Sequence, residues 1–213
     1  MGNKSVAPQT PTPQTSGPEE ESQSPSTGLR SLQRPGGGNQ FANAVAGTNT
    51  TKLTINGTIL AGGPLSDNTV KAVNEAAKNT PSQWKRYVAY AQVVKVGGSL
   101  AWRANNPGNL RDASTKIGTV SGAVGSFAAF ATLEEGRTAQ RNLYLNTYGA
   151  MTVRNAINKL TPPSENNTAA YLSKLEKDGV DLDKDVASQI DALMAGVEAN
   201  EGLISGTEVQ RVP

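Results

Sequence analysis

The sequence of 213 residues contains neither cysteine nor histidine. Without cysteine, the chain can form no disulfide and has no thiolate chemistry. Without histidine, it lacks the usual zinc ligand and the commonest general base. Aromatic residues make up only 5% of the chain, and all of them lie between Phe41 and Tyr171. We therefore expect one core of modest size in that part of the sequence.

A strong excess of one charge and long apolar runs are also missing. The chain has 20 basic and 18 acidic side chains, which gives a net charge of +2. Nucleic-acid binding favours a concentrated basic face, so this balance argues against it. No run approaches the roughly 18 apolar residues that a membrane helix needs. No charged and then apolar signal peptide opens the sequence. We expect no membrane contact, no cofactor and no metal.

The first 40 residues differ in composition from the rest of the chain. They hold six of the twelve prolines and no aromatic residue. Such a segment cannot bury enough apolar surface to offset its loss of conformational entropy. We expect residues 1–40 to form an extended arm, disordered alone, that lies along a partner in an assembly. Residues 41–65 are predicted to be a short β arm or linker, because Asn56-Gly57 interrupts an alternating pattern, as in a hairpin.

Helical patterns dominate from residue 66 to residue 205. Capping residues mark several helix starts, including the Thr132-Leu-Glu-Glu135 capping box, and Gly149 is expected to end a helix in a left-handed conformation. Small residues between Lys116 and Ala131 predict a short β-hairpin. The fold class is therefore mainly α with a small β-hairpin, followed by a tail over residues 206–213. The predicted helices cover residues 66–78, 82–96, 132–148, 152–160, 164–178 and 184–198.

The stretch AWRANNPGNLRD, residues 101–112, places three asparagines and Arg111 on a loop that Pro107 and Gly108 keep from becoming a helix. Amide side chains both donate and accept hydrogen bonds, so they match sugar hydroxyls and N-acetyl groups without adding charge. An arginine can hold a carboxylate with two hydrogen bonds. The loop could therefore form the polar rim of a sugar-binding cleft. The alternative is turn chemistry, in which the amides bind their own backbone.

Three separated motifs support the first interpretation. WRANNPGNLR, SFAAFATLEEGRTAQ and TVRNAINKLTPPSENNTAAYLSKLEKDG occur in the order found in a lysozyme-like domain of phage and prophage proteins. The sequence from Trp102 to Gly179 resembles that domain, although Ala104 replaces an asparagine usual in the group. The resemblance implies a lysozyme-like α+β fold, with a cleft lined by the loop and the hairpin. The matching positions are residues 105–111, then Phe127, Phe130 and Gly136, and then Pro162, Pro163, Glu165, Asn166, Asn167, Thr168 and Tyr171.

Catalysis would require a carboxylic acid that protonates the leaving oxygen of a glycosidic bond. In the broader superfamily that the chain resembles, this glutamate lies late in the helix before the loop, but residues 82–96 contain no acid. Glu165 is the candidate catalytic residue, because the surrounding PPSENNT is rich in polar side chains; the alternative is that it complements a helix dipole. Glu75 is expected to face solvent, and Glu135 to complete the capping box. The candidate substrate-binding residues are Asn105, Asn106, Asn109, Arg111, Phe127, Asn166 and Tyr171.

These features lead to one expected function and two alternatives. We expect a bacteriophage virion-associated structural protein that binds peptidoglycan, and weakly cleaves it, during infection. Whether it is a muramidase, a lytic transglycosylase or a binder without activity stays open. Its partners would be peptidoglycan, further copies of itself in a homo-oligomer, and other virion proteins that the arm contacts. It would be assembled in the bacterial cytoplasm, where cysteine-free proteins are common. The alternatives are a purely structural assembly protein with an inactive lysozyme-like scaffold, and a bacterial effector secreted without a cleaved signal peptide.

Overall fold

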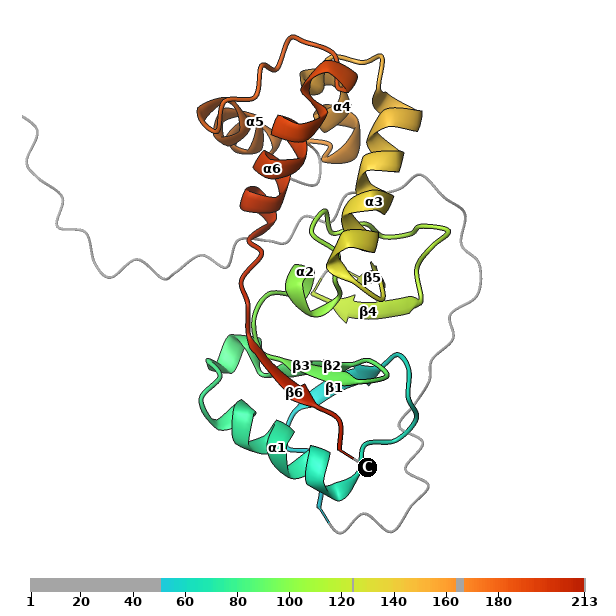
Figure 1. Cartoon of the computed structure of the whole chain (residues 1–213). Coiled ribbons are helices and arrows are strands. Elements are labelled where there is room, and N and C mark those ends of the chain that lie inside the picture. Colours follow the sequence, from blue (N-terminus) through green and yellow to red (C-terminus); the bar gives the residue numbers. More distant parts are fainter. Residues whose placement is uncertain (1–50, 124, 164–166, 213) are drawn as a thin grey trace, which may run out of the picture.

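A computed structural model describes residues 51–123, 125–163 and 167–212. The predicted arm of residues 1–40 lies outside this range, as do Glu165 and Asn166. The described residues form a mixed α+β structure with six α-helices, a four-stranded sheet and a two-stranded hairpin. In Figure 1 the four-stranded sheet lies between α1 on one side and the hairpin on the other, with α3 to α6 beyond the hairpin.

The four-stranded sheet has the order β1-β2-β3-β6. Strand β1 (Asn56–Ile59) runs parallel to β2 (Arg86–Ala89), whereas β2 and β3 (Val93–Val96) are antiparallel, as are β3 and β6 (Thr207–Gln210). Two predictions are therefore wrong. Residues 82–96 form a short 3-10 turn, η1 (Ser82–Trp84), and two strands instead of a helix. Residues 206–213, predicted to be a tail, contribute β6, which returns from α6 to the sheet (Figure 1).

The helix prediction for residues 82–96 failed because the sheet is buried on both faces. Tyr87 and Ala89 pack with the core beneath α1 (Asp67–Lys78), and Val88 packs with the hairpin and Ala104 on the other face. A strand buried on both sides shows a continuous apolar run and no alternation. The tight turn at Ala91-Gln92 also contains no glycine or proline to mark it. Apolar stripes at helical spacing were the only remaining signal, and they were misleading.

Of the two alternatives for residues 41–65, a hairpin at Asn56-Gly57 is wrong, since both residues lie inside β1, and the β arm agrees with this strand. Gly57 is required there for a packing reason. A Cβ at this position would collide with the ring of Tyr87 on the neighbouring strand. The glycine therefore marks a close approach between strand and aromatic ring and not a turn.

The predicted hairpin between Lys116 and Ala131 is confirmed as β4 (Gly118–Gly122) and β5 (Gly125–Ala129). It follows α2 (Leu100–Arg103), a single helical turn that opens the asparagine-rich loop. Phe127 and Ala128 of β5 are fully buried, so the hairpin forms part of the core.

The helical half of the molecule follows the predicted order. The helix over 66–78 and the one over 152–160 are confirmed, and α5 ends before Gly179 as expected. The last helix, α6, starts six residues later than predicted, after a 3-10 turn, η3 (Ala187–Gln189). The four helices after the hairpin share one apolar core with Leu110 and Phe130. The helices are α3 (Leu133–Leu143), α4 (Val153–Leu160), α5 (Thr168–Lys177) and α6 (Ile190–Glu201).

The helix predicted to end at Gly149 does continue to Tyr148, but its last turn is a π-helix, η2 (Tyr144–Tyr148). Gly149 does not adopt the predicted left-handed conformation, because its φ is −52°. Instead, a Cβ on this glycine would lie 2.5 Å from the carbonyl oxygen of Leu145. The glycine lets the backbone pass close to the widened turn.

The Thr132 cap at the start of α3 is confirmed, but the return hydrogen bond to Glu135 comes from Ala131, one residue before the position that a capping box requires. The Thr132 hydroxyl accepts a hydrogen bond from the Glu135 amide at 3.1 Å, and the Glu135 carboxylate accepts one from the Ala131 amide. Replacing Thr132 with alanine should lower the free energy of unfolding by about 1 kcal/mol, the usual cost of losing such a cap. Urea denaturation would measure this, and Thr138→Ala, at an exposed position of the same helix, is the control. Equal stability of the two variants would show that the cap contributes nothing.

Candidate functional site

The asparagine-rich loop packs tightly between the sheet, the hairpin and α3. Asn105 and Asn109 adopt left-handed conformations, with φ of 53° and 48°, which asparagine tolerates better than most residues. A Cβ on Gly108 would lie 2.6 Å from the Gln140 side chain. A Cβ on Gly136 of α3 would strike the carbonyl oxygen of Asn105. The loop is therefore shaped by turn chemistry and close packing against α3.

Asn106 is fully buried, and its amide binds only its own chain. Its nitrogen donates to the carbonyl oxygens of Leu110 and Ala128, both at 2.8 Å. Its oxygen accepts from the Leu110 amide, also at 2.8 Å. The prediction that Asn106 lies on a ligand rim is therefore wrong, because all three hydrogen bonds hold the loop to itself and to the hairpin.

Asn105 has the same structural role on the other side of the loop, so its place on the predicted rim is also wrong. Its nitrogen donates to the carbonyl oxygens of Phe130 and Ala131 at 3.0 Å. Its oxygen accepts from the Lys95 ammonium at 2.6 Å, and this lysine lies 4.6 Å from the ring centre of Trp102. Burial lowers the pKa of Lys95, although the Coulomb attraction of Glu208 opposes the shift. The Lys95–Asn105 pair joins β3 to the loop.

Phe127 differs from the prediction, whereas Arg111 is half-buried and its predicted ligand contact stays a prediction. Phe127 is fully buried in the core and offers no surface to a ligand. The Arg111 guanidinium lies 4.7 Å from the Phe127 ring centre, and it passes Gly125 so closely that a Cβ there would lie 2.7 Å away. The arginine therefore covers one side of the hairpin, a packing role that does not require a carboxylate ligand.

Two predicted site residues do come together, at a carboxyl group that the sequence analysis missed. The Asn109 amide donates to Glu201 Oε2 at 2.7 Å, and the Tyr171 hydroxyl donates to Glu201 Oε1 at 3.2 Å. Glu201 is the last residue of α6, Tyr171 belongs to α5, and Asn109 belongs to the loop. One carboxyl thus joins a residue of the first motif to a residue of the third, Asn109 and Tyr171, which are 62 positions apart in the sequence. We call these three residues the Glu201 cluster.

The environment of Glu201 favours its protonated form. Burial raises its pKa from 4.5 to about 7, and this effect outweighs the hydrogen bonds from Asn109 and Tyr171 and the charge of Lys174, which lower it. Burial and the nearby Glu201 charge also raise the pKa of Tyr171 well above its ordinary value. A carboxyl that holds its proton near neutral pH is suited to act as a general acid.

Two buried acceptors near the cluster find no donor within the described part of the chain. They are Asn109 Oδ1 and Gln140 Oε1. Gln140 lies against Gly108 of the loop, and its nitrogen donates to the Tyr144 hydroxyl at 3.3 Å. Buried polar atoms are normally hydrogen-bonded, and unsatisfied ones are typical of sites that receive water or a ligand. The surroundings of the cluster can therefore accept further hydrogen bonds.

The other acids considered from the sequence have ordinary roles where they can be described. Glu75 is exposed and pairs with Lys78 at 2.6 Å, as expected, and Asp112 pairs with Lys116. The predicted catalytic residue Glu165 and the predicted binding residue Asn166 lie outside the described residues. Over residues 51–123, 125–163 and 167–212, no group of three acidic side chains could hold a metal ion.

One signal in the sequence could have identified Glu201. An acidic residue in the last turn of a helix opposes the helix dipole, so it is disfavoured there without another reason. The predicted last helix ended at Glu198, which placed Glu201 beyond it. In the structure both acids lie in the final turn of α6. Arg137 of α3 gives Glu198 two hydrogen bonds, at 3.1 and 2.7 Å, which account for this acid. Within the described part of the chain, no arginine or lysine is hydrogen-bonded to Glu201.

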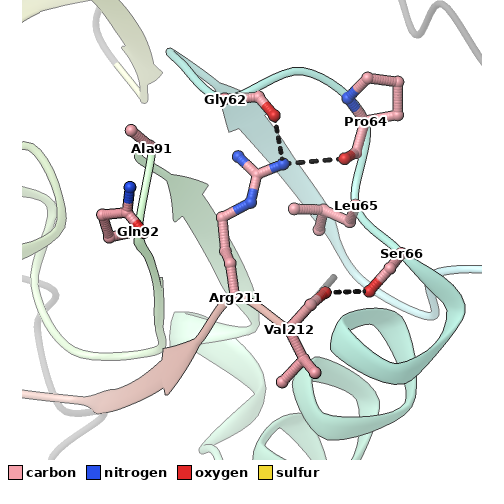
Figure 2. Close-up of a pocket in the computed structure, with 8 residues that line it drawn as sticks. All are labelled: Gly62, Pro64, Leu65, Ser66, Ala91, Gln92, Arg211 and Val212. Atoms are coloured by element: carbon pink, nitrogen blue, oxygen red, sulfur yellow. Dashed lines mark hydrogen bonds between the residues drawn. The ribbon is translucent and has the colours of Figure 1, made fainter.

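A cavity beside the sheet has a structural explanation. It measures about 450 Å³ and is lined by the loop after β1, the β2–β3 turn and the residues that follow β6 (Figure 2). The Arg211 guanidinium at its centre donates to five backbone carbonyls, including those of Gly62 and Pro64 at 2.8 Å. The Val212 carbonyl accepts from the Ser66 hydroxyl at the start of α1. These contacts fasten the end of β6 to the start of the described chain.

Comparison of the chain with models of protein families, with curated proteins and with solved structures finds no match in any of the three. Within the described residues, no helix has both the length and the apolar composition to cross a membrane.

Proposed function

We propose that this chain is a bacteriophage virion-associated protein whose lysozyme-like domain binds peptidoglycan and cleaves it weakly, with Glu201 instead of Glu165 as the proton donor. The observation that carries the proposal is the Glu201 cluster. The resemblance to phage lysozyme-like domains rests on separated motifs, and Asn109 of the first motif and Tyr171 of the third both hold the Glu201 carboxyl. A carboxyl with a pKa of about 7 has the protonation state that glycosidic cleavage needs.

The chemistry of the cluster fits a single general acid. Protonated Glu201 would donate its proton to the glycosidic oxygen as the bond to the leaving sugar breaks. A water molecule or a hydroxyl group of the substrate would then bond to the anomeric carbon, and its proton would return to the Glu201 carboxylate. The carboxylate left behind would keep its hydrogen bonds from Asn109 and Tyr171, and these bonds strengthen once the acceptor is charged. The same two donors therefore stabilise the product of the proton transfer. A lytic transglycosylase, one of the activities that the resemblance implies, works with one acid.

The test is the release of soluble fragments from purified peptidoglycan by the wild type and by Glu201→Gln. Loss of a general acid typically lowers the rate 100-fold or more, roughly, so the variant should release almost nothing. Glu198→Gln is the matched control, because it removes a carboxyl from the same helix turn and should keep the wild-type rate. Equal release by wild type and Glu201→Gln would exclude Glu201 as the acid.

A second candidate function is a purely structural virion protein with an inactive lysozyme-like scaffold. The amide network favours it, because the side chains of Asn105 and Asn106 donate their hydrogen bonds to backbone carbonyls of the protein itself. In this case Glu201 would only connect α6 to the loop and to α5. The wild type would then neither sediment with insoluble peptidoglycan nor release fragments from it.

In both cases we propose that residues 1–40 contact other virion proteins and that the chain assembles as a homo-oligomer in the virion. The proposal rests on the composition of the arm, which is rich in proline and polar residues.

A further inference from the structure

A second polar site lies beside the loop, where nothing in the sequence had indicated one. A groove of about 410 Å³ runs between residues 110–115 and the C-terminal half of the long helix formed by α3 and η2. Leu110, Ala139 and Leu143 form apolar parts of its lining, and Asn142 and Asn146 are among its polar residues. We call it the Asn142 groove. Glu201 does not line it.

The amides of this groove differ from those of the asparagine-rich loop. Asn105 and Asn106 are buried and bind the backbone. In contrast, Asn142 and Asn146 are exposed, and over the described ranges neither side chain makes a hydrogen bond. The groups that sequence reasoning assigned to the loop, neutral amides free to meet a ligand, are therefore found in the Asn142 groove.

The π-helical turn brings additional polar side chains to the same wall. In a regular α-helix three consecutive residues spread over more than half of the circumference, because a turn holds 3.6 residues. Here three consecutive residues, Asn146, Thr147 and Tyr148, all line the groove. They belong to η2, whose wider turn lets successive side chains lie closer to one face. Isolated π turns often occur at functional sites.

The groove carries almost no net charge. Its one acidic residue, Asp112, pairs with the ammonium of Lys116 on the same segment. Among the residues that the structure describes, no basic side chain lines it. A phosphate or another anion would find no cation there, and a cationic ligand would compete with Lys116. The groove therefore suits a neutral ligand that has both apolar surfaces and many hydrogen-bonding groups.

We propose that the Asn142 groove binds a neutral N-acetylated glycan strand. The apolar lining around Ala139 and Leu143 would contact a sugar ring face or an acetyl methyl group. The amides of Asn142 and Asn146 would donate to and accept from ring hydroxyls and the N-acetyl amide. This inference deepens the proposed function, because it assigns the site that holds the glycan while leaving bond cleavage to the Glu201 cluster.

The test is isothermal titration of the full chain with tri-N-acetylchitotriose. We expect the wild type to bind, and the double variant Asn142→Ala/Asn146→Ala to bind at least 10-fold more weakly. Asn155→Ala, an exposed asparagine on α4 outside the groove, is the matched control and should bind like the wild type. Thermal melts of all three proteins should agree, because the substituted side chains are exposed and make no hydrogen bond with the described residues.

Peptidoglycan sedimentation and fragment release on the same proteins separate the possible failures. If the wild type binds the trisaccharide and the double variant binds it equally well, the groove is not the glycan site, although the proposed function stands. The wild type could instead cleave peptidoglycan, or sediment with it, without binding the trisaccharide. In that case the assignment of the groove as the glycan site is wrong, although the proposed function stands. If the wild type neither binds the trisaccharide nor engages peptidoglycan, both proposals are wrong.

Discussion

Replacing Asn106 with alanine is expected to lower the free energy of unfolding by about 3 kcal/mol, because it removes three buried hydrogen bonds worth about 1 kcal/mol each. The amide joins the ends of the asparagine-rich loop through Leu110, and it joins the loop to the hairpin through Ala128. Without it, the Leu110 amide is left buried with no acceptor. For a protein of this size, the melting temperature should fall by about 6–12 °C.

Two further variants make this prediction specific. Asn106→Asp keeps the acceptor for the Leu110 amide but turns a negative oxygen towards the carbonyls of Leu110 and Ala128, so it should be at least as destabilising as alanine. Asn155→Ala removes an exposed asparagine and should change the free energy of unfolding by less than about 0.5 kcal/mol. A normal melting temperature for Asn106→Ala, combined with weaker peptidoglycan binding, would instead restore the ligand-rim interpretation.

Local features of the fold were predictable because local chemistry determines them. The N-terminal caps Ser66, Thr132 and Thr152 each accept a hydrogen bond from the third residue of their helix, as the sequence pattern indicates. The hairpin β4–β5 was likewise marked by its own small residues. In each case the signal and the structure that it specifies lie within a few residues of each other.

The four-stranded sheet could not be predicted in this way, because its pairings are distant in the sequence. Val94 of β3 pairs with Val209 of β6, more than 100 residues later. Strand β1 pairs in parallel with β2 and is separated from it by α1. Neither edge strand has a turn signal that points to its partner. The sheet therefore depends on burial between α1 and the hairpin, which only the complete fold supplies.

The site was predicted in part for a related reason. An amide can bind a sugar or a backbone carbonyl with the same atoms, so the residue types in NNPGN could not distinguish the two. Asn105 and Asn106 are buried, so their amides bind backbone carbonyls and not a sugar. Asn109 and Tyr171, both predicted as binding residues, contact one carboxyl, but that carboxyl comes from α6 and lies 30 residues after Tyr171, beyond the last recognised motif.

The stability of the wild type should fall as the pH rises from about 5 to 8, and Glu201→Gln should remove most of that fall. The carboxyl has a pKa of about 7 in the folded state against an ordinary value of 4.5. Between these values the folded state holds a proton that the unfolded state has released. Raising the pH through this window therefore favours unfolding, by at most about 3 kcal/mol. The free energy of unfolding starts to fall above the pKa of Glu201 in the unfolded state, and the fall is complete above its pKa in the folded state.

Urea denaturation at pH 5 and pH 8 would measure this effect. Glutamine is similar in size and has no proton to lose, so Glu201→Gln should gain stability relative to the wild type at pH 8 and not at pH 5. Glu198→Gln, three residues earlier in the same turn of α6, should keep the wild-type pH dependence. If stability instead rises with pH and Glu201→Gln is weaker at pH 8, Glu201 is an ionised partner of Asn109 and Tyr171. Such a carboxylate could not serve as a proton donor, so this measurement also tests the proposed chemistry without any glycan present.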